Sequence, residues 1–172
     1  INEAIINYNK AIIIKPTSKT YNNLGVAFKI LGNHIDAIKS YNHSISLEPK
    51  NAEAFYNRGI IYQKIHQYEN SVNSYKEAIL INPNYEYAYY NLGIALKDVI
   101  FNPPMIDLNN IIINILERKT YLNPNDISKT VLRLLKHDNE IKNIIENNSF
   151  IKLEQSFLKV TSQLSKIPLL IK

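Results

Sequence analysis

The sequence contains no cysteine and no tryptophan, and it has only one methionine and four glycines in 172 residues. The absence of cysteine excludes disulfide bonds, thiolate metal sites and cysteine nucleophiles. No stretch of 18 apolar residues is present, so the sequence predicts no membrane-spanning helix. Apolar residues nevertheless make up 45% of the chain, which favours a packed core over disorder.

The charges show no concentration of one sign. Lys and Arg number 20 and Asp and Glu 15, which gives a net charge of +5 spread over both halves of the chain. Nucleic-acid binding requires a clustered basic patch, and none is present. The sequence therefore predicts no nucleic-acid partner.

Sequence motifs of enzymes are also missing. There is no glycine-rich phosphate loop, no HExxH motif and no nucleophile elbow. The carboxylates of the helical segments are interpreted as solvated. The histidines show no metal-ligand spacing; they are His34, His43, His66 and His137. We therefore expect no catalytic residue, no metal and no cofactor, and the chain itself is not expected to be an enzyme.

Glycine and proline recur with a period of about 34 residues. The glycines are Gly25, Gly59 and Gly93, and the prolines are Pro16, Pro49 and Pro83. A period of this size is typical of helical repeats in which each unit packs on the next. Glycine in a helix interior costs about 0.5–1 kcal/mol relative to alanine, so three glycines at one spacing indicate close helix crossings.

The residues between glycine and proline repeat as well. A small residue is followed four positions later by tyrosine, as in Ala4-x3-Tyr8, Ala37-x3-Tyr41 and Ser71-x3-Tyr75. This pattern resembles the tetratricopeptide repeat (TPR) family over about residues 1–100. The resemblance implies an all-α solenoid of helical hairpins: a half repeat, two full repeats and one further first helix. We expect helices near 1–14, 18–31, 34–47, 52–65, 68–81 and 86–99.

Two residues depart from the repeat. Arg58 stands where the other units have leucine, and His66 stands where the preceding unit has Gly32 in its turn. We expect the turn at His66 to be less relaxed than the turn at Gly32.

After Asp98 the repeat pattern ends. The segment Phe101-Asn102-Pro103-Pro104 cannot continue a helix. Apolar stripes predict four more helices in residues 101–172, with Asp107 and Asp138 as N-caps. The turn at 125–129 and the terminal Ile-Pro-Leu-Leu-Ile-Lys resemble the helical connector of bacterial TPR-containing methyltransferase proteins. Because the chain starts at Ile1 and ends in an apolar run, we expect it to be a fragment of a longer protein.

Asparagine occupies one repeated position, two residues before each glycine: Asn23, Asn57 and Asn91. An amide offers both an acceptor and donors, which suits a peptide backbone. The row resembles the asparagine ladder in the repeats of O-linked N-acetylglucosamine transferases. The alternative is that these amides form hydrogen bonds within the array.

Flanking positions complete a candidate peptide groove on the concave face that the resemblance implies. Besides the three asparagines, the candidate groove contains an amide and two tyrosines, an aliphatic stripe and longer polar side chains. They are Asn22, Tyr56 and Tyr90; Val26, Ile60 and Ile94; and Lys29, Gln63 and Lys97. For the aliphatic stripe, packing against the next helix is the alternative.

The family also contains binders of chaperone tails, which hold a C-terminal carboxylate with paired cations and asparagine. Of the residues at the corresponding positions, only Asn57 fits, and Asn22, Val26, Tyr87 and Asn91 do not. This mode is therefore rejected.

The sequence predicts a cytoplasmic protein- or peptide-binding scaffold with an extended polypeptide as its partner. The alternative is a non-catalytic arm that presents substrate to a methyltransferase or glycosyltransferase domain beyond Lys172. A purely architectural spacer is the third interpretation.

Overall fold

The computed structural model describes residues 1–98. These residues form six α-helices and no strand, in agreement with the all-α expectation and within one residue of the expected bounds. The helices are α1 (Asn2–Ile14), α2 (Ser18–Ile30), α3 (His34–Leu47), α4 (Ala52–Lys64), α5 (Tyr68–Ile81) and α6 (Glu86–Asp98). The helices and N-caps predicted after Pro104 lie outside the described residues.

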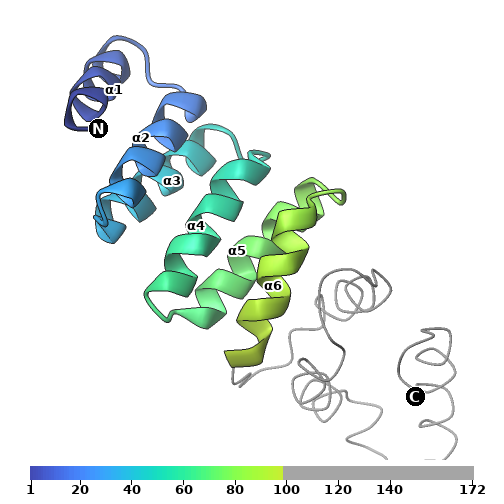
Figure 1. Cartoon of the computed structure of the whole chain (residues 1–172). Coiled ribbons are helices and arrows are strands. Elements are labelled where there is room, and N and C mark those ends of the chain that lie inside the picture. Colours follow the sequence, from blue (N-terminus) through green and yellow to red (C-terminus); the bar gives the residue numbers. More distant parts are fainter. Residues whose placement is uncertain (99–172) are drawn as a thin grey trace, which may run out of the picture. The chain divides into compact units, whose positions relative to one another are not determined.

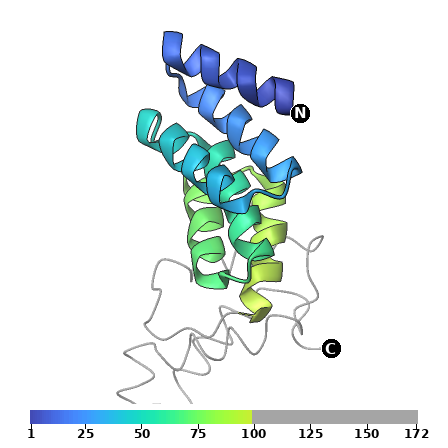
Figure 2. The ribbon, with the colours of Figure 1, turned by 90° about the vertical axis from the view of Figure 1, so that its left-hand side faces the viewer.

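The helices pack as successive pairs. The closest partners are α2 with α3 and α4 with α5, while α1 packs on α2 and α3 on α4. Figures 1 and 2 show the pairs stacked in chain order from α1 to α6. We call α2, α4 and α6 helices A and α1, α3 and α5 helices B, so that α1 is the second helix of an incomplete pair. Residues Ile1–Ala95 form one compact unit.

Gly25 and Gly59 lie where a helix A crosses its helix B. A Cβ atom on Gly25 would lie 2.5 Å from Cε1 of Tyr41, and one on Gly59 would lie 2.6 Å from Cε1 of Tyr75. Both tyrosines are fully buried. The ring therefore occupies the space of the missing side chain, which confirms the packing reason inferred from the glycine spacing.

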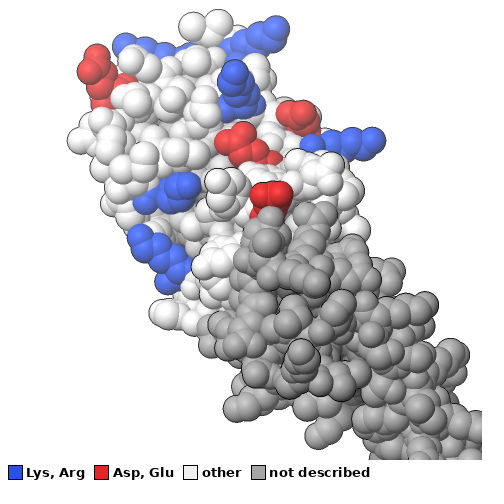
Figure 3. Space-filling view, turned by 45° about the vertical axis from the view of Figure 1, so that its right-hand side comes forward, with Lys and Arg blue, Asp and Glu red and all other residues white. Residues whose placement is uncertain are grey.

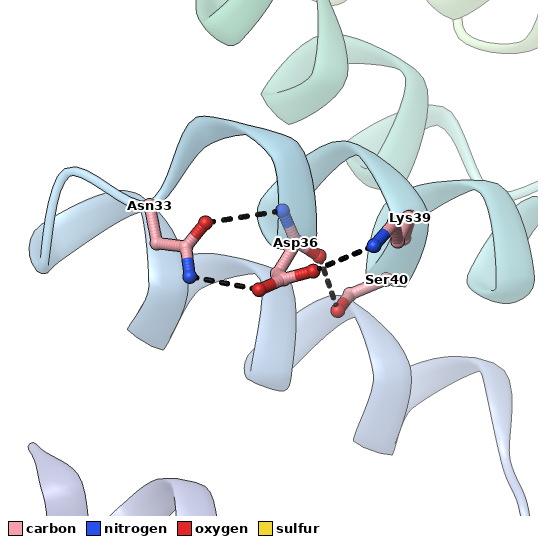
Figure 4. A network of polar contacts seen from close by, with 4 residues as sticks. All are labelled: Asn33, Asp36, Lys39 and Ser40. Carbon is pink, nitrogen blue, oxygen red and sulfur yellow. Dashed lines mark hydrogen bonds and ion pairs between the residues drawn. The ribbon is translucent and has the colours of Figure 1, made fainter.

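Polar side chains cap three of the helices at their first turn. The Oδ1 atom of Asn51 accepts a hydrogen bond from the backbone N–H of Ala54 at 3.0 Å, and Thr17 and Asn33 cap α2 and α3 in the same way. Figure 4 shows the cap at Asn33, whose Nδ2 also donates to Asp36 at 2.8 Å. These caps satisfy N–H groups that have no partner inside the helix. The abundance of asparagine in this chain concealed the caps at Asn33 and Asn51 in the sequence.

The turns from α2 to α3 and from α4 to α5 have the same geometry. In the first turn, the N–H of Asn33 donates to the carbonyl of Phe28, and the N–H of Gly32 donates to the carbonyl of Lys29. In the second turn, Gln67 donates to Tyr62 and His66 donates to Gln63 in the same way. The central residue is left-handed in both, with φ +75° at Gly32 and φ +60° at His66. Left-handed backbone is costly for a residue with a Cβ atom, so the expected strain at His66 is confirmed.

Replacing His66 with glycine is expected to stabilise the chain by about 1 kcal/mol, because glycine adopts the left-handed region without steric cost. The gain is reduced by loss of the exposed hydrogen bond between His66 Nδ1 and the Tyr68 hydroxyl. Urea unfolding followed by circular dichroism measures the change. Gly32→Ala is the matched control and should destabilise, since no atom lies near Gly32 and strain alone acts there. An unchanged or lower midpoint for His66→Gly would contradict this account.

Four buried or half-buried tyrosines make stability fall at alkaline pH. Burial is the main cause that raises the pKa of Tyr41, Tyr56, Tyr75 and Tyr85, the last to about 12. The folded state therefore binds more protons than the unfolded state above the ordinary tyrosine pKa of 10.0. Stability from these groups is complete below that pH and is lost as the pH rises through the folded-state values. Burial lowers the pKa of Lys29 and of Arg58, and these two groups act in the opposite sense to the four tyrosines.

Urea midpoints measured at about pH 8 and about pH 11 should show the loss, and tyrosinate absorbance should appear at higher pH in the folded chain than in the denatured chain. Tyr85→Phe should reduce the difference between the two midpoints. Equal midpoints would show that the tyrosines titrate alike in both states.

Candidate functional site

Side chains of successive helices A meet on one side of the stack, which we call the helix-A face. The face is defined by three hydrogen bonds that join one helix A to the next. They are Asn57 Nδ2 to Asn22 Oδ1 at 3.4 Å, Lys29 Nζ to Asn57 Oδ1 at 3.2 Å and Asn91 Nδ2 to the Tyr56 hydroxyl at 3.0 Å. The helices B contribute no group to these three bonds.

Asn57 lies at the centre of the helix-A face. This residue is only 6% exposed, and Asn22 only 3%. Because its amide accepts from Lys29 and donates to Asn22, Asn57 ties α4 to α2. Burial lowers the pKa of Lys29, and the charge of Glu53 raises it in part. These contacts accord with the alternative that this amide forms hydrogen bonds within the array.

Asn91 and Asn23 are more open than Asn57, and both are half-buried. Asn91 donates to Tyr56, while its Oδ1 accepts no hydrogen bond within residues 1–98. Asn23 makes no side-chain hydrogen bond in the same range. Two of the three asparagines therefore keep hydrogen-bonding capacity for a ligand.

The remaining candidates differ in exposure. Val26 is half-buried and packs against the core cluster of Ala37, Tyr41 and Ile61, which accords with the packing alternative for this position. Gln63 accepts a hydrogen bond from the Tyr75 hydroxyl at 2.8 Å. Of the other residues of the candidate groove, Ile60 and Ile94 are half-buried and Tyr90 is exposed. The side chain of Lys97 lies outside those described.

Arg58 proves to be a bridge between helices. Its Nε donates to Ser74 of α5 at 3.2 Å, and its Nη1 donates to Asn42 of α3 at 2.8 Å. The guanidinium lies 5.0 Å from the ring centroid of Phe55 and 5.9 Å from that of Tyr62. The guanidinium thus joins α4 to both flanking helices B.

Figure 3 shows basic and acidic side chains interspersed among uncharged ones on the face in view. Residues 1–98 hold no group of three or more His, Asp or Glu side chains placed to bind a metal ion. Among the helices described, none combines the length and the apolar character needed to cross a membrane.

Comparison with known proteins agrees with this arrangement. A tetratricopeptide repeat model matches residues 52–85, and a second TPR repeat model matches residues 25–65. No curated protein matches the sequence.

Similar solved structures include two of MamA and one of YrrB. One MamA structure has 22% identity and a TM-score of 0.56, with 91% of this chain and 89% of that chain covered. The other has 19% identity and a TM-score of 0.56, with 83% of this chain and 66% of that chain covered. YrrB, a TPR protein with an unusual peptide-binding site, has 18% identity and a TM-score of 0.55, with 91% and 74% covered. At these identities the likeness establishes the fold only.

The 34-residue spacing, the glycine crossings and the two family matches point to one conclusion. The helical repeats in residues 25–85 match the tetratricopeptide repeat family.

Proposed function

We propose that this chain is a protein-binding scaffold that holds an extended polypeptide along the helix-A face. The observation that carries the proposal is the row of amides and tyrosines on α2, α4 and α6, which is fixed by hydrogen bonds one repeat apart. An extended peptide takes affinity from its main chain and selectivity from side-chain pockets. Open hydrogen-bonding groups at Asn23 and Asn91 suit its backbone, and the tyrosines suit its side chains.

The family supports the same function. YrrB, which shares the fold, is a TPR protein with a peptide-binding site. We also propose the domain division at about residue 100, with a helical extension in 101–172. The alternative arm would present substrate to a methyltransferase or glycosyltransferase domain beyond Lys172, and no contact within residues 1–98 favours it.

Selection from a random peptide library displayed on phage tests the proposal. The full chain is immobilised, and peptides recovered from it are synthesised with a fluorescent label and titrated in solution. We expect saturable binding to the wild-type chain. Binding should weaken when residues of the helix-A face are replaced, and it should persist when exposed residues of α5 are replaced. Failure to recover any saturable peptide would overturn the proposal.

A further inference from the structure

Tyrosines gather near the N-terminal ends of α4 and α6. The ring centroids of Tyr56 and Tyr85 lie 4.9 Å apart with an interplanar angle of 37°. The amide of Asn91 donates to the Tyr56 hydroxyl and so fixes this ring. Tyr87 and Tyr90 lie three residues apart on α6, and so on one side of this helix, with 70% and 45% of their surface exposed. The helix-A face therefore has a fixed pair of rings bordered by open ones.

Glu53 belongs to the same cluster. It lies three residues before Tyr56 on α4, which places the two side chains on one side of the helix. Its charge contributes to the raised pKa of Tyr85, and Tyr87 contributes to that of Tyr56, after burial in both cases. The carboxylate, the fixed pair of rings and Tyr87 are therefore neighbours.

The Glu53 carboxylate is exposed and has no ion pair within residues 1–98. The nearby cation, Lys29, feels the charge of Glu53 but donates its hydrogen bond to Asn57 instead. Arg58 is held by α3 and α5. The Glu53 carboxylate thus lies beside several aromatic rings. No Lys or Arg side chain within residues 1–98 forms an ion pair with it.

This combination selects for a cation. The faces of aromatic rings carry negative charge density and attract a cation placed over them. A guanidinium group stacks on such faces and also forms two parallel hydrogen bonds with a carboxylate, which an ammonium group cannot do. An acidic side chain would meet the like charge of Glu53.

We infer that Glu53, Tyr56, Tyr85, Tyr87 and Tyr90 form a subsite for an arginine side chain of the bound peptide. The inference rests on the proposed function, since it names a side chain that the extended ligand must carry. In the complex, the arginine stacks on the open tyrosines and pairs with the carboxylate, while the peptide main chain lies along the asparagine row.

Peptides recovered by the phage selection provide the test. Arginine should be enriched at one position of the aligned peptides. Each synthetic peptide is compared with a matched version in which that arginine is replaced by citrulline, which has the same shape without the charge. We expect citrulline to weaken binding to the wild-type chain by roughly tenfold. Glu53→Gln and Tyr87→Ala should bind the two peptides nearly equally.

Glu69→Gln is the matched control, because Glu69 is an exposed residue in the first turn of a helix B. It should preserve the full preference for arginine. Circular dichroism verifies that each variant is folded. If peptides bind but show no arginine position, or if citrulline binds as well as arginine, the subsite is wrong and the proposed function stands. If no peptide binds, both are wrong.

Discussion

Replacing Gly59 with leucine is expected to destabilise the repeats by about 3 kcal/mol, near the upper end of what overpacking costs. The first carbon of the new side chain would already lie 2.6 Å from Cε1 of Tyr75, a ring with no exposed surface. Neither α4 nor Tyr75 can move away without breaking the crossing, because Ser71 also donates to the carbonyl of Gly59 at 3.0 Å. The effect should extend to neighbouring units, since repeats are stabilised by their neighbours.

Thermal and urea unfolding of the full chain measure this effect. Lys64→Leu is the control, since it adds leucine to an exposed position of the same helix. A second test is a double-mutant cycle with Gly59→Ala and Tyr75→Leu. Gly59→Ala should destabilise the chain much less when Tyr75 is replaced with leucine, because the tyrosine ring that the added methyl group would contact is gone. An unchanged unfolding midpoint for Gly59→Leu would contradict the close crossing.

Replacing Asn23 and Asn91 together with alanine is expected to weaken peptide binding by about 5- to 150-fold. This estimate assigns one hydrogen bond to the ligand for each residue, at about 0.5–1.5 kcal/mol per bond. Asn57 is left in place because its amide makes two bonds between α4 and α2, against the one bond that Asn91 makes to Tyr56, so Asn57→Ala should lower stability by about 1 kcal/mol and confuse the comparison.

Fluorescence titration with a selected peptide measures the loss. The matched control is the double variant Asn9→Ala and Asn73→Ala, which removes two exposed asparagines from helices B. It should bind like the wild type. Equal affinities for the Asn23/Asn91 variant, with the chain folded, would show that the amide row serves the array alone.

The sequence was sufficient to predict the helices and their crossings. Glycine is the only residue that fits over Tyr41 or Tyr75, so the crossing leaves a mark at a fixed spacing. A less relaxed turn at His66 was also predicted, because Gly32 marks the equivalent position, and the left-handed backbone at both residues accounts for it. Both features depend on positions that are equivalent in successive repeats, which a periodic pattern shows directly.

Contacts between non-equivalent positions could not be read from the period. Asn57 bonds Asn22 and Asn91 bonds Tyr56, and both pairs are 35 residues apart instead of 34. The offset arises because a residue of one helix A bonds the residue that precedes its equivalent in the previous helix A. Asparagines at an equal spacing of 34 residues therefore do not reveal whether they form hydrogen bonds with one another. Likewise, Arg58 was seen to depart from the repeat, but its partners lie on two other helices.

The central claim is that an extended polypeptide binds across α2, α4 and α6. A crystal structure of the full chain with a selected peptide tests it most directly. The account expects the peptide main chain within hydrogen-bonding distance of Asn23 and Asn91, with one side chain against Tyr87. A peptide seated on α3 and α5, with the helix-A face empty, would contradict it.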